Sequence, residues 1–275
     1  MSFFSKPVLP KEHGAWVALL VPMFIGAAAY PGGSLNLPAI TLLVISSCSA
    51  MLLMEPVRIV LKQAAIDDSK RIYGWMIIYF AVSTGSFTLL ISYYDRWGLL
   101  WFVIPAFLMV TLKLWSSVAR IQRVKWIEIA GALGLTVSAL AAFYTQRGSF
   151  LPEGWILYLL CAVWVVDRTV AARLILPKIR SGLDVERIKG FKVAFAGLYE
   201  HISRLFVVII VLTVFHDHAP WTAFLPFLLA TYKNVDLIVL GKIPADPFKF
   251  GFSEMRLGIL FSIFMVFVWR MDKLL

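Results

Sequence analysis

Nine stretches of mostly apolar residues alternate along the chain with short segments rich in Pro, Gly and charged residues. An α-helix rises 1.5 Å per residue, so about 20 apolar residues span the hydrocarbon core of a bilayer. The pattern therefore predicts an all-α, polytopic membrane bundle of nine transmembrane helices in a single domain over residues 1–275. The expected spans cover about 14–30, 37–54, 74–94, 97–117, 125–145, 154–176, 193–215, 221–241 and 253–271.

Composition supports the membrane class. The chain is 60% hydrophobic and 15% charged, whereas soluble domains are about 45–50% apolar and about 25% charged. These values exclude a soluble fold, a disulfide scaffold and a disordered chain. The two cysteines, Cys48 and Cys161, lie inside apolar runs and are expected to be small buried side chains.

The distribution of basic residues predicts the orientation. With the amino terminus inside, 22 of the 26 Lys and Arg residues fall on the inner side, leaving Arg96, Arg147, Arg270 and Lys273 outside. Inner loops of bacterial membrane proteins carry such an excess. We therefore expect a multi-pass protein of the bacterial cytoplasmic (inner) membrane, with the amino terminus inside and the carboxyl terminus outside. The net charge of +10 is explained by these loops, and no nucleic-acid partner is expected.

Ionisable residues inside the spans mark the candidate site, because an unpaired charge in a membrane is costly. All of them lie in the cytoplasmic halves of their helices, and Asp167, Arg204 and Lys233 lie near mid-membrane. We expect a polar cavity that opens to the cytoplasm and is closed outside. Three residues are candidate catalytic acids or bases: His13, Glu200 and His201. The candidate substrate-binding residues are Glu12, Glu55, Arg58, Asp167, Arg168, Arg204, Lys233, Asn234 and Asp236.

Several of these residues also fit plainer roles. Glu200 and Arg204 have the i,i+4 spacing of a structural ion pair, and Lys113, Arg173 and Lys242 lie near helix ends, where basic side chains extend to the interface. His216 and His218 belong to a short outer turn, where a plain loop is expected. No metal ligand set is predicted, and the chain lacks P-loop, HExxH and GxSxG motifs.

The segment Pro10-Lys11-Glu12-His13-Gly14-Ala15-Trp16 resembles the signature at the start of the YwiC-like family of bacterial membrane proteins. This resemblance covers seven contiguous residues, and the rest of the chain agrees in length and span pattern. We expect Glu12 and His13 to point into the bundle, with Gly14 and Ala15 allowing neighbouring helices to approach.

In architecture the chain also resembles, more distantly, the UbiA superfamily of intramembrane prenyltransferases. Those enzymes carry Asp-rich motifs after their second and sixth helices, which hold Mg²⁺ on the diphosphate of a prenyl donor. Here the corresponding segments run from Glu55 to Asp68 and from Asp167 to Glu186, and neither has the NDxxDxxxD or DxxxD pattern. A Mg²⁺ cofactor therefore stays open. Arg and Lys side chains can bind a diphosphate without a metal.

Two functions remain open from the sequence. The first is an enzyme that transfers a prenyl or similar lipidic group, with a membrane lipid or isoprenoid substrate and an anionic small molecule entering from the cytoplasmic side. The second is a non-catalytic carrier or accessory protein for a lipid, quinone or haem pathway. The absence of a clear repeat between the halves counts against a carrier.

Overall fold

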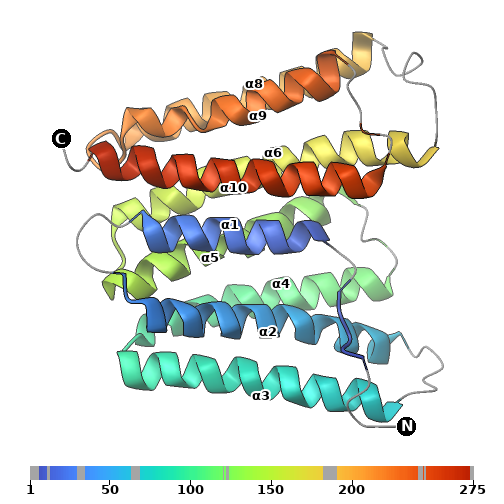
Figure 1. Ribbon diagram of the computed structural model, residues 1–275, viewed down its shortest axis with the longest axis vertical. Helices are drawn as coiled ribbons and strands as arrows, with labels where there is room; N and C mark the ends of the chain where they lie inside the picture. Colours follow the sequence, from blue (N-terminus) through green and yellow to red (C-terminus); the bar gives the residue numbers. More distant parts are fainter. Residues whose placement is uncertain are drawn as a thin grey trace.

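The computed structural model describes residues 6–10, 13–29, 35–62, 69–119, 121, 124–181, 191–240, 244 and 246–272. In these residues the chain forms nine α-helices and no strand, as the sequence predicts. The helices lie side by side, and each runs roughly antiparallel to the one before it (Figure 1). They are α1 (His13–Ala28), α2 (Leu37–Leu61), α3 (Ser69–Tyr94), α4 (Leu100–Val118), α5 (Lys125–Arg147), α6 (Pro152–Ser181), α8 (Phe191–Val214), α9 (Phe227–Asn234) and α10 (Pro247–Asp272).

Six helical segments in this part of the chain are long and apolar enough to cross a membrane. They are Leu37–Leu61, Ser69–Tyr94, Trp97–Val118, Lys125–Arg147, Gly197–Val214 and Pro247–Met271. α1 is shorter, with an apolar stretch from Gly14 to Ala28, and α6 is longer, with 30 residues. Many large apolar side chains on α3 and α4 are exposed, as expected of helices that face lipid.

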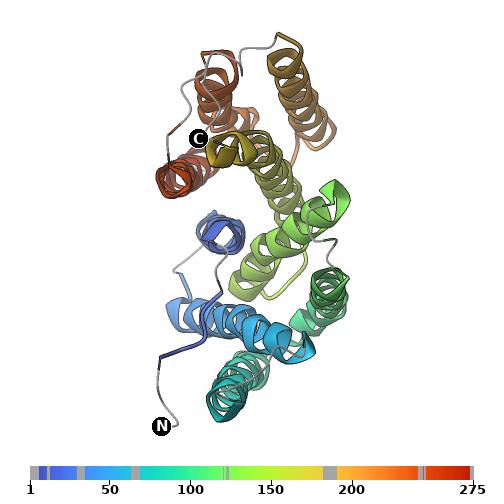
Figure 2. The same ribbon diagram turned by 90° about the vertical axis from the view of Figure 1, so that its right-hand side faces the viewer.

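Helices α1 and α5 occupy the middle of the bundle (Figures 1 and 2). Val21 and Ile25 of α1 belong to a core shared with α5, α6, α8, α9 and α10, in which Trp164 stacks on Phe261 at 4.7 Å between ring centroids. Leu19 and Met23 of α1 belong to a second core, shared with α2 to α5. α1 therefore links the two halves through opposite faces.

Close contact between α1 and α5 depends on a glycine that the sequence analysis did not single out. A Cβ atom on Gly26 would overlap the backbone of Ala139 in α5, so no larger residue fits there. Gly14 is instead exposed, with no described atom near its Cβ position. The expectation that Gly14 lets a neighbouring helix approach is therefore wrong for the described residues.

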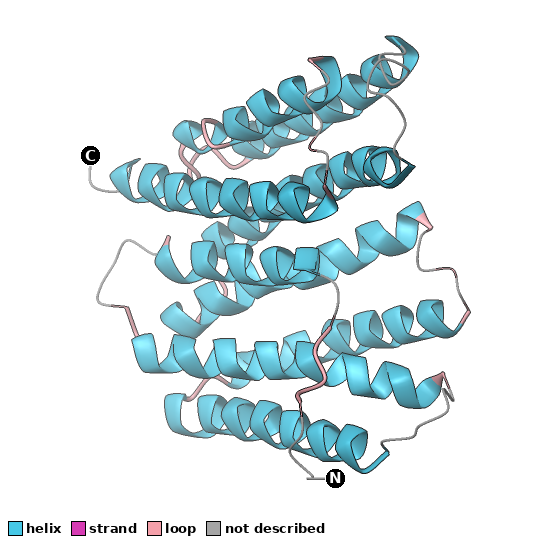
Figure 3. Cartoon of the chain, turned by 45° about the vertical axis from the view of Figure 1, so that its right-hand side comes forward, coloured by secondary structure: helices cyan, strands magenta, loops and turns pink. Residues whose placement is uncertain are grey.

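The eighth predicted span is not one regular helix. It consists of a 3₁₀ turn, η2 (Trp221–Phe224), followed by the eight-residue α9 and a π-helical turn, η3 (Val235–Val239). Pro220 and Pro226 immediately precede the first two pieces. Proline lacks a backbone N–H, so Pro226 cannot continue the hydrogen-bond pattern of a helix from the turn before it, which explains the break between η2 and α9. The described residues that connect the other helices form turns and loops, pink in Figure 3.

Two arginines that the sequence places on the outer side stabilise the ends of the central helices. Arg270 Nε donates to the carbonyl of Ala28 at the end of α1 (2.6 Å), and Arg96 Nε donates to the carbonyl of Thr145 in the last turn of α5 (2.8 Å). The last carbonyls of a helix lack partners and carry partial negative charge. These basic residues of the predicted outer side thus complete helix ends.

Candidate functional site: a buried ionic network

Asp167, near the middle of α6, is the centre of a polar network between four helices. Its Oδ1 accepts from Arg204 Nε of α8 at 2.8 Å and lies 2.9 Å from His201 Nδ1. Its Oδ2 accepts from Asn234 Nδ2 at 3.1 Å and lies 3.6 Å from Arg168 Nη1. The carboxylate is 3% exposed and its oxygens are surrounded by donors. Asp167 therefore has the partners that a buried carboxylate needs.

Arg168 connects this centre to α10. Its Nε and Nη2 donate to the two carboxylate oxygens of Glu254 at 2.7 and 2.9 Å, a bidentate geometry. Its Nη1 donates to Asn234 Oδ1 at 2.7 Å. This bond fixes the Asn234 amide, with its nitrogen toward Asp167. The end of α9 is thus held between α6 and α10.

His201 of α8 forms the other arm of the network. Its Nδ1 faces Asp167 Oδ1, and its Nε2 lies 3.0 Å from Thr231 Oγ1 of α9. Asn234 Nδ2 also lies 2.7 Å from Nδ1, and because an amide nitrogen carries two hydrogens it can donate both to Asp167 and to this ring nitrogen. A bare Nδ1 would place its lone pair against the Asp167 carboxylate. The Asp167 carboxylate thus favours a proton on Nδ1, whereas the Asn234 amide favours a bare Nδ1.

Exposure rises steadily from this interior toward the start of α5. His201 is 2% exposed, the Arg204 side chain 17%, and the side chains of Glu200 and Lys125 are 37% and 43% exposed. Glu200 accepts from Lys125 Nζ at 2.9 Å and lies 3.4 Å from Arg204 Nη1. Lys125 is the first residue of α5. The network therefore extends from the bundle interior to the end where α5 begins.

The network is balanced in charge when His201 is neutral. Its three acids are Asp167, Glu200 and Glu254, and its three bases are Lys125, Arg168 and Arg204. An anionic ligand must therefore compete with a carboxylate for a base. Arg204 is the base best placed for such an exchange, because it is partly exposed and meets Glu200 only at 3.4 Å.

Six of the twelve predicted site residues come together here: Asp167, Arg168, Glu200, His201, Arg204 and Asn234. Glu55 and Arg58 form a separate ion pair within α2 at 2.6 Å, and α2 lies in the other half of the bundle (Figure 1). Glu12 and the side chain of His13 lie outside the described residues. Lys233 and Asp236 are half-buried on α9 and η3, and Asp236 makes an interaction of its own. The network atoms contact one another directly and do not themselves outline a cavity. The cavity therefore stays a prediction.

Three members of the network were not among the predicted site residues: Lys125, Thr231 and Glu254. Glu254 lies two turns into α10, and a carboxylate inside an apolar span was the signal that could have identified it. Thr231 gave no such signal, because a threonine in a membrane helix usually bonds its own backbone. It does so here as well, to the carbonyl of Phe227 at 3.1 Å.

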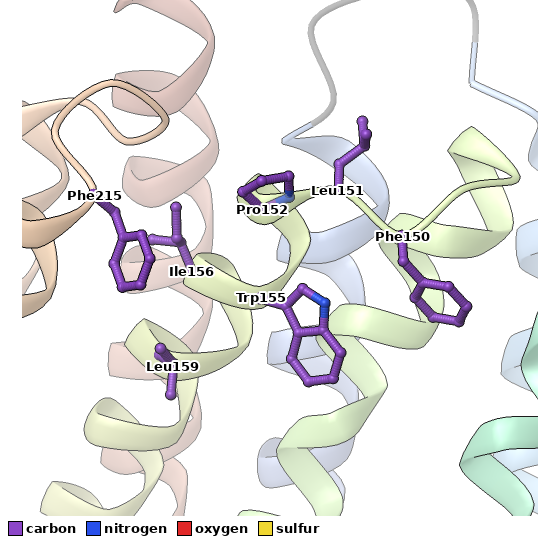
Figure 4. Close-up of a pocket in the computed structure, with 7 residues that line it drawn as sticks. All are labelled: Phe150, Leu151, Pro152, Trp155, Ile156, Leu159 and Phe215. Atoms are coloured by element: carbon purple, nitrogen blue, oxygen red, sulfur yellow. The ribbon is translucent and has the colours of Figure 1, made fainter.

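A pocket of about 430 Å³ lies elsewhere, where α5 meets α6 (Figure 4). It is apolar, and the rings of Trp155 and Phe150, both labelled in the close-up, line it. The full lining is Phe150, Leu151, Pro152, Trp155, Ile156, Leu159 and Phe215. It offers none of the charged residues of the network.

The described residues do not fit a Mg²⁺ site. No group of three or more His, Cys, Asp or Glu side chains among them is placed to hold a metal ion. Glu55 is paired with Arg58, and both oxygens of Asp167 face nitrogen donors, whereas Mg²⁺ requires free oxygen ligands. Asp67, Asp68, Asp184 and Glu186 lie outside the described residues.

Taken together, the apolar helices and the buried ionic network define a multi-pass membrane protein. The sequence model of the YwiC-like proteins matches residues 9–143. Residues 9–143 of this chain are thus similar to the YwiC-like family, in agreement with the resemblance of the segment from Pro10 to Trp16. The match runs from the start of α1 into α5, so most of the network lies beyond it.

A curated relative supports the same family. The chain is 25% identical over 163 residues to the protein of Bacillus subtilis (strain 168) described as "Uncharacterized protein YwiC". The match covers 58% of this chain and 64% of that protein, less than two thirds of its length. No solved structure matches the chain. The likeness to the UbiA superfamily therefore stays a prediction.

Proposed function

We propose that this chain is an intramembrane enzyme that transfers a prenyl or similar lipidic group to an acceptor entering from the cytoplasmic side. The observation that carries the proposal is the hydrogen-bonded array of Asp167, His201 and Thr231, buried at mid-helix in an apolar bundle. Such an array supplies an oriented acid–base group, since a carboxylate that holds Nδ1–H makes Nε2 the nitrogen that accepts a proton. Intramembrane ionisable groups that face the bundle interior usually serve function.

In this proposal His201 takes the proton of the acceptor as the new bond forms. Asp167 holds the imidazole in position and stabilises the imidazolium. The departing anionic head of the lipidic donor is neutralised by Arg204, and Lys233, a half-buried base of α9, is a second candidate for this role. Glu200 has a lesser role, because it is bound to Lys125 and Arg204 at the exposed end of the network. His13 stays a candidate acid or base, and the inner membrane stays the proposed location.

Binding of a diphosphate to the purified, full-length protein in lipid nanodiscs tests the proposal. Farnesyl diphosphate is the probe, and its affinity is measured by tryptophan fluorescence. A charge-assisted hydrogen bond contributes about 1.5–3 kcal/mol, so Arg204→Ala should weaken binding by about tenfold or more. Arg173→Ala is the matched control, because Arg173 forms an exposed ion pair with Glu128 at 2.8 Å, and it should change affinity by less than about twofold. Equal effects of the two substitutions would contradict an anion site at Arg204.

A specific observation favours the second candidate, a carrier. The discontinuous eighth span of η2, α9 and η3 resembles the broken helices that form substrate sites in secondary transporters. Reaction products separate the two functions. An enzyme that is given farnesyl diphosphate and an acceptor extract releases inorganic diphosphate, whereas a carrier in liposomes moves the intact molecule across the bilayer. If saturating probe gives neither diphosphate release nor transport, an accessory role in a lipid, quinone or haem pathway remains.

A further inference from the structure

The two arginines of the network differ in how fully their guanidinium groups are bonded. All three nitrogens of Arg168 donate to neighbouring side chains at 2.7–2.9 Å. Arg204 donates through Nε to Asp167 at 2.8 Å, but its Nη1 lies 3.4 Å from Glu200. Among the described residues, no side chain or carbonyl accepts a hydrogen bond from Arg204 Nη2. The terminal edge of Arg204, which Nη1 and Nη2 form, therefore retains donors for an anion.

Lys125 holds Glu200 away from this terminal edge. Glu200 Oε1 accepts from Lys125 Nζ at 2.9 Å, whereas Glu200 Oε2 lies 3.4 Å from Arg204 Nη1. Charge-assisted hydrogen bonds of this kind are about 2.7–2.9 Å long, so the contact with Lys125 is close and the contact with Arg204 is stretched. Glu200 and Arg204 lie one turn apart on α8, a spacing that allows a close pair. We attribute the longer distance to the pull of Lys125 from the start of α5.

We infer that Glu200 is a displaceable counter-ion at an oxyanion site on Arg204, and that Lys125 is the residue that positions this counter-ion. A phosphate or carboxylate group takes the place of Glu200 at the terminal edge of Arg204, and Glu200 then pairs with Lys125 alone. No covalent bond changes in this exchange. The inference rests on the proposed function, because the incoming group is the anionic head of the lipidic donor. It adds a regulator of that site, Lys125, which the sequence analysis did not identify.

Charge and exposure support the exchange. The incoming group replaces one negative neighbour of Arg204 with another, and Asp167 stays bound to Nε. The displaced carboxylate need not be buried, because the side chains of Glu200 and Lys125 are 37% and 43% exposed. Arg168, with a side chain 8% exposed, keeps its own carboxylate partner throughout. The exchange therefore takes place at the accessible end of the network and leaves its desolvated ion pairs intact. The planar fork of a guanidinium also matches two oxygens of a phosphate or carboxylate.

The affinities of three variants for two anions test this inference. Inorganic diphosphate and farnesyl diphosphate are titrated calorimetrically into the full-length protein in nanodiscs. Glu200→Gln removes the competing charge and keeps the shape of the side chain, so it should tighten binding by about fivefold. Lys125→Met should weaken binding by a similar factor, because Glu200 then closes on Arg204. The double variant Lys125→Met/Glu200→Gln should bind as tightly as Glu200→Gln, since no counter-ion is left to position.

The matched controls are Glu128→Gln and Arg173→Met, which make the same charge changes in another exposed ion pair of α5 (2.8 Å). Each should alter affinity by less than about twofold.

The outcomes separate this inference from the proposed function. Tightening with farnesyl diphosphate alone also supports the exchange and assigns the anion to a lipid headgroup. Equal tightening by Glu200→Gln and Glu128→Gln would overturn it, because a general charge effect would then suffice. A double variant as weak as Lys125→Met would make Lys125 an anion ligand and overturn its positioning role. If Arg204→Ala weakens binding while Glu200→Gln leaves it unchanged, this inference alone is wrong. If Arg204→Ala has no effect, the proposed anion site is wrong as well.

Discussion

At the residue scale, the network shows how nine polar side chains are tolerated within an apolar bundle. Each buried charge has at least one opposite charge in direct contact, and the amide of Asn234 uses both of its ends. Burying charges is costly and a paired geometry only offsets that cost, so a buried ion pair is weak evidence for added stability. The presence of buried ion pairs in this bundle is therefore better explained by function or by the specific pairing of α6 with α10.

Removing one partner of a buried ion pair reveals the free-energy cost of leaving the other charge buried. Glu254→Ala leaves the guanidinium of Arg168, 8% exposed, without its bidentate carboxylate. We expect the free energy of unfolding to fall by about 3–5 kcal/mol, because an uncompensated buried charge remains. The measurement is reversible unfolding in mixed detergent micelles, followed by tryptophan fluorescence.

The control for this variant is Glu128→Ala, which removes the partner of Arg173. That pair has side-chain exposures of 38% and 32%, so the loss should stay below about 1 kcal/mol. The double variant Arg168→Met/Glu254→Leu should recover most of the stability lost in Glu254→Ala, since it removes both charges. Similar losses for Glu254→Ala and Glu128→Ala would show that the network is not desolvated.

At the element scale, α1 has the most demanding packing, because it lies against α5 and between the two cores. Gly26→Ala should destabilise the protein by about 1–3 kcal/mol, since a new methyl group meets the backbone of Ala139, which cannot move aside as a side chain would. Gly14→Ala, in the same helix, has open space around it and should stabilise by up to about 1 kcal/mol. Thermal unfolding in micelles measures both. A Gly26→Ala protein as stable as Gly14→Ala would contradict the close α1–α5 contact.

The spans were predictable from sequence because membrane helices need a fixed length of apolar residues. The expected run at 97–117 becomes η1 (Trp97–Leu99) followed by α4, and the run at 125–145 becomes α5 with one further half-turn. The expected run at 37–54 becomes α2, which extends beyond the predicted end at residue 54 to Leu61. Hydropathy misses such extensions, because a helix continues into the interface where Glu55 and Arg58 pair with each other.

The site was predictable only in part. Depth along each helix placed Asp167, His201 and Arg204 at one level, and neighbouring helices brought them together. Which face each side chain occupies depends on tertiary packing. For this reason Asn234, next to Lys233 in the chain, enters the network as its amide bridge, while Thr231 gave no signal of its contact with His201. The break in the eighth span follows from Pro226 and the π turn at Val235–Val239, which an apolar run conceals.

At the scale of the whole molecule, the two cores are joined through α1 and α5, which contribute residues to both. Family likeness covers residues 9–143, which hold α1 to α4 and most of α5. Most of the ionic network belongs to the other half. α1 begins within the signature segment and contacts both halves of the bundle. The two parts of the chain are therefore structurally coupled.

The nine-helix arrangement predicts opposite locations for the two ends of the chain. The first and last helices run in the same direction (Figure 1), and 22 of the 26 basic residues fall in the segments that the sequence predicts to lie inside. We expect the amino terminus inside and the carboxyl terminus outside, because inner loops retain Lys and Arg. Alkaline phosphatase fused after Leu275 should be active, and green fluorescent protein at the same position should stay dark. Fusions after Lys62, at the end of α2, are the control and should give the reverse pattern. A fluorescent carboxyl-terminal fusion would mean that one span, most simply the discontinuous eighth, does not cross the membrane.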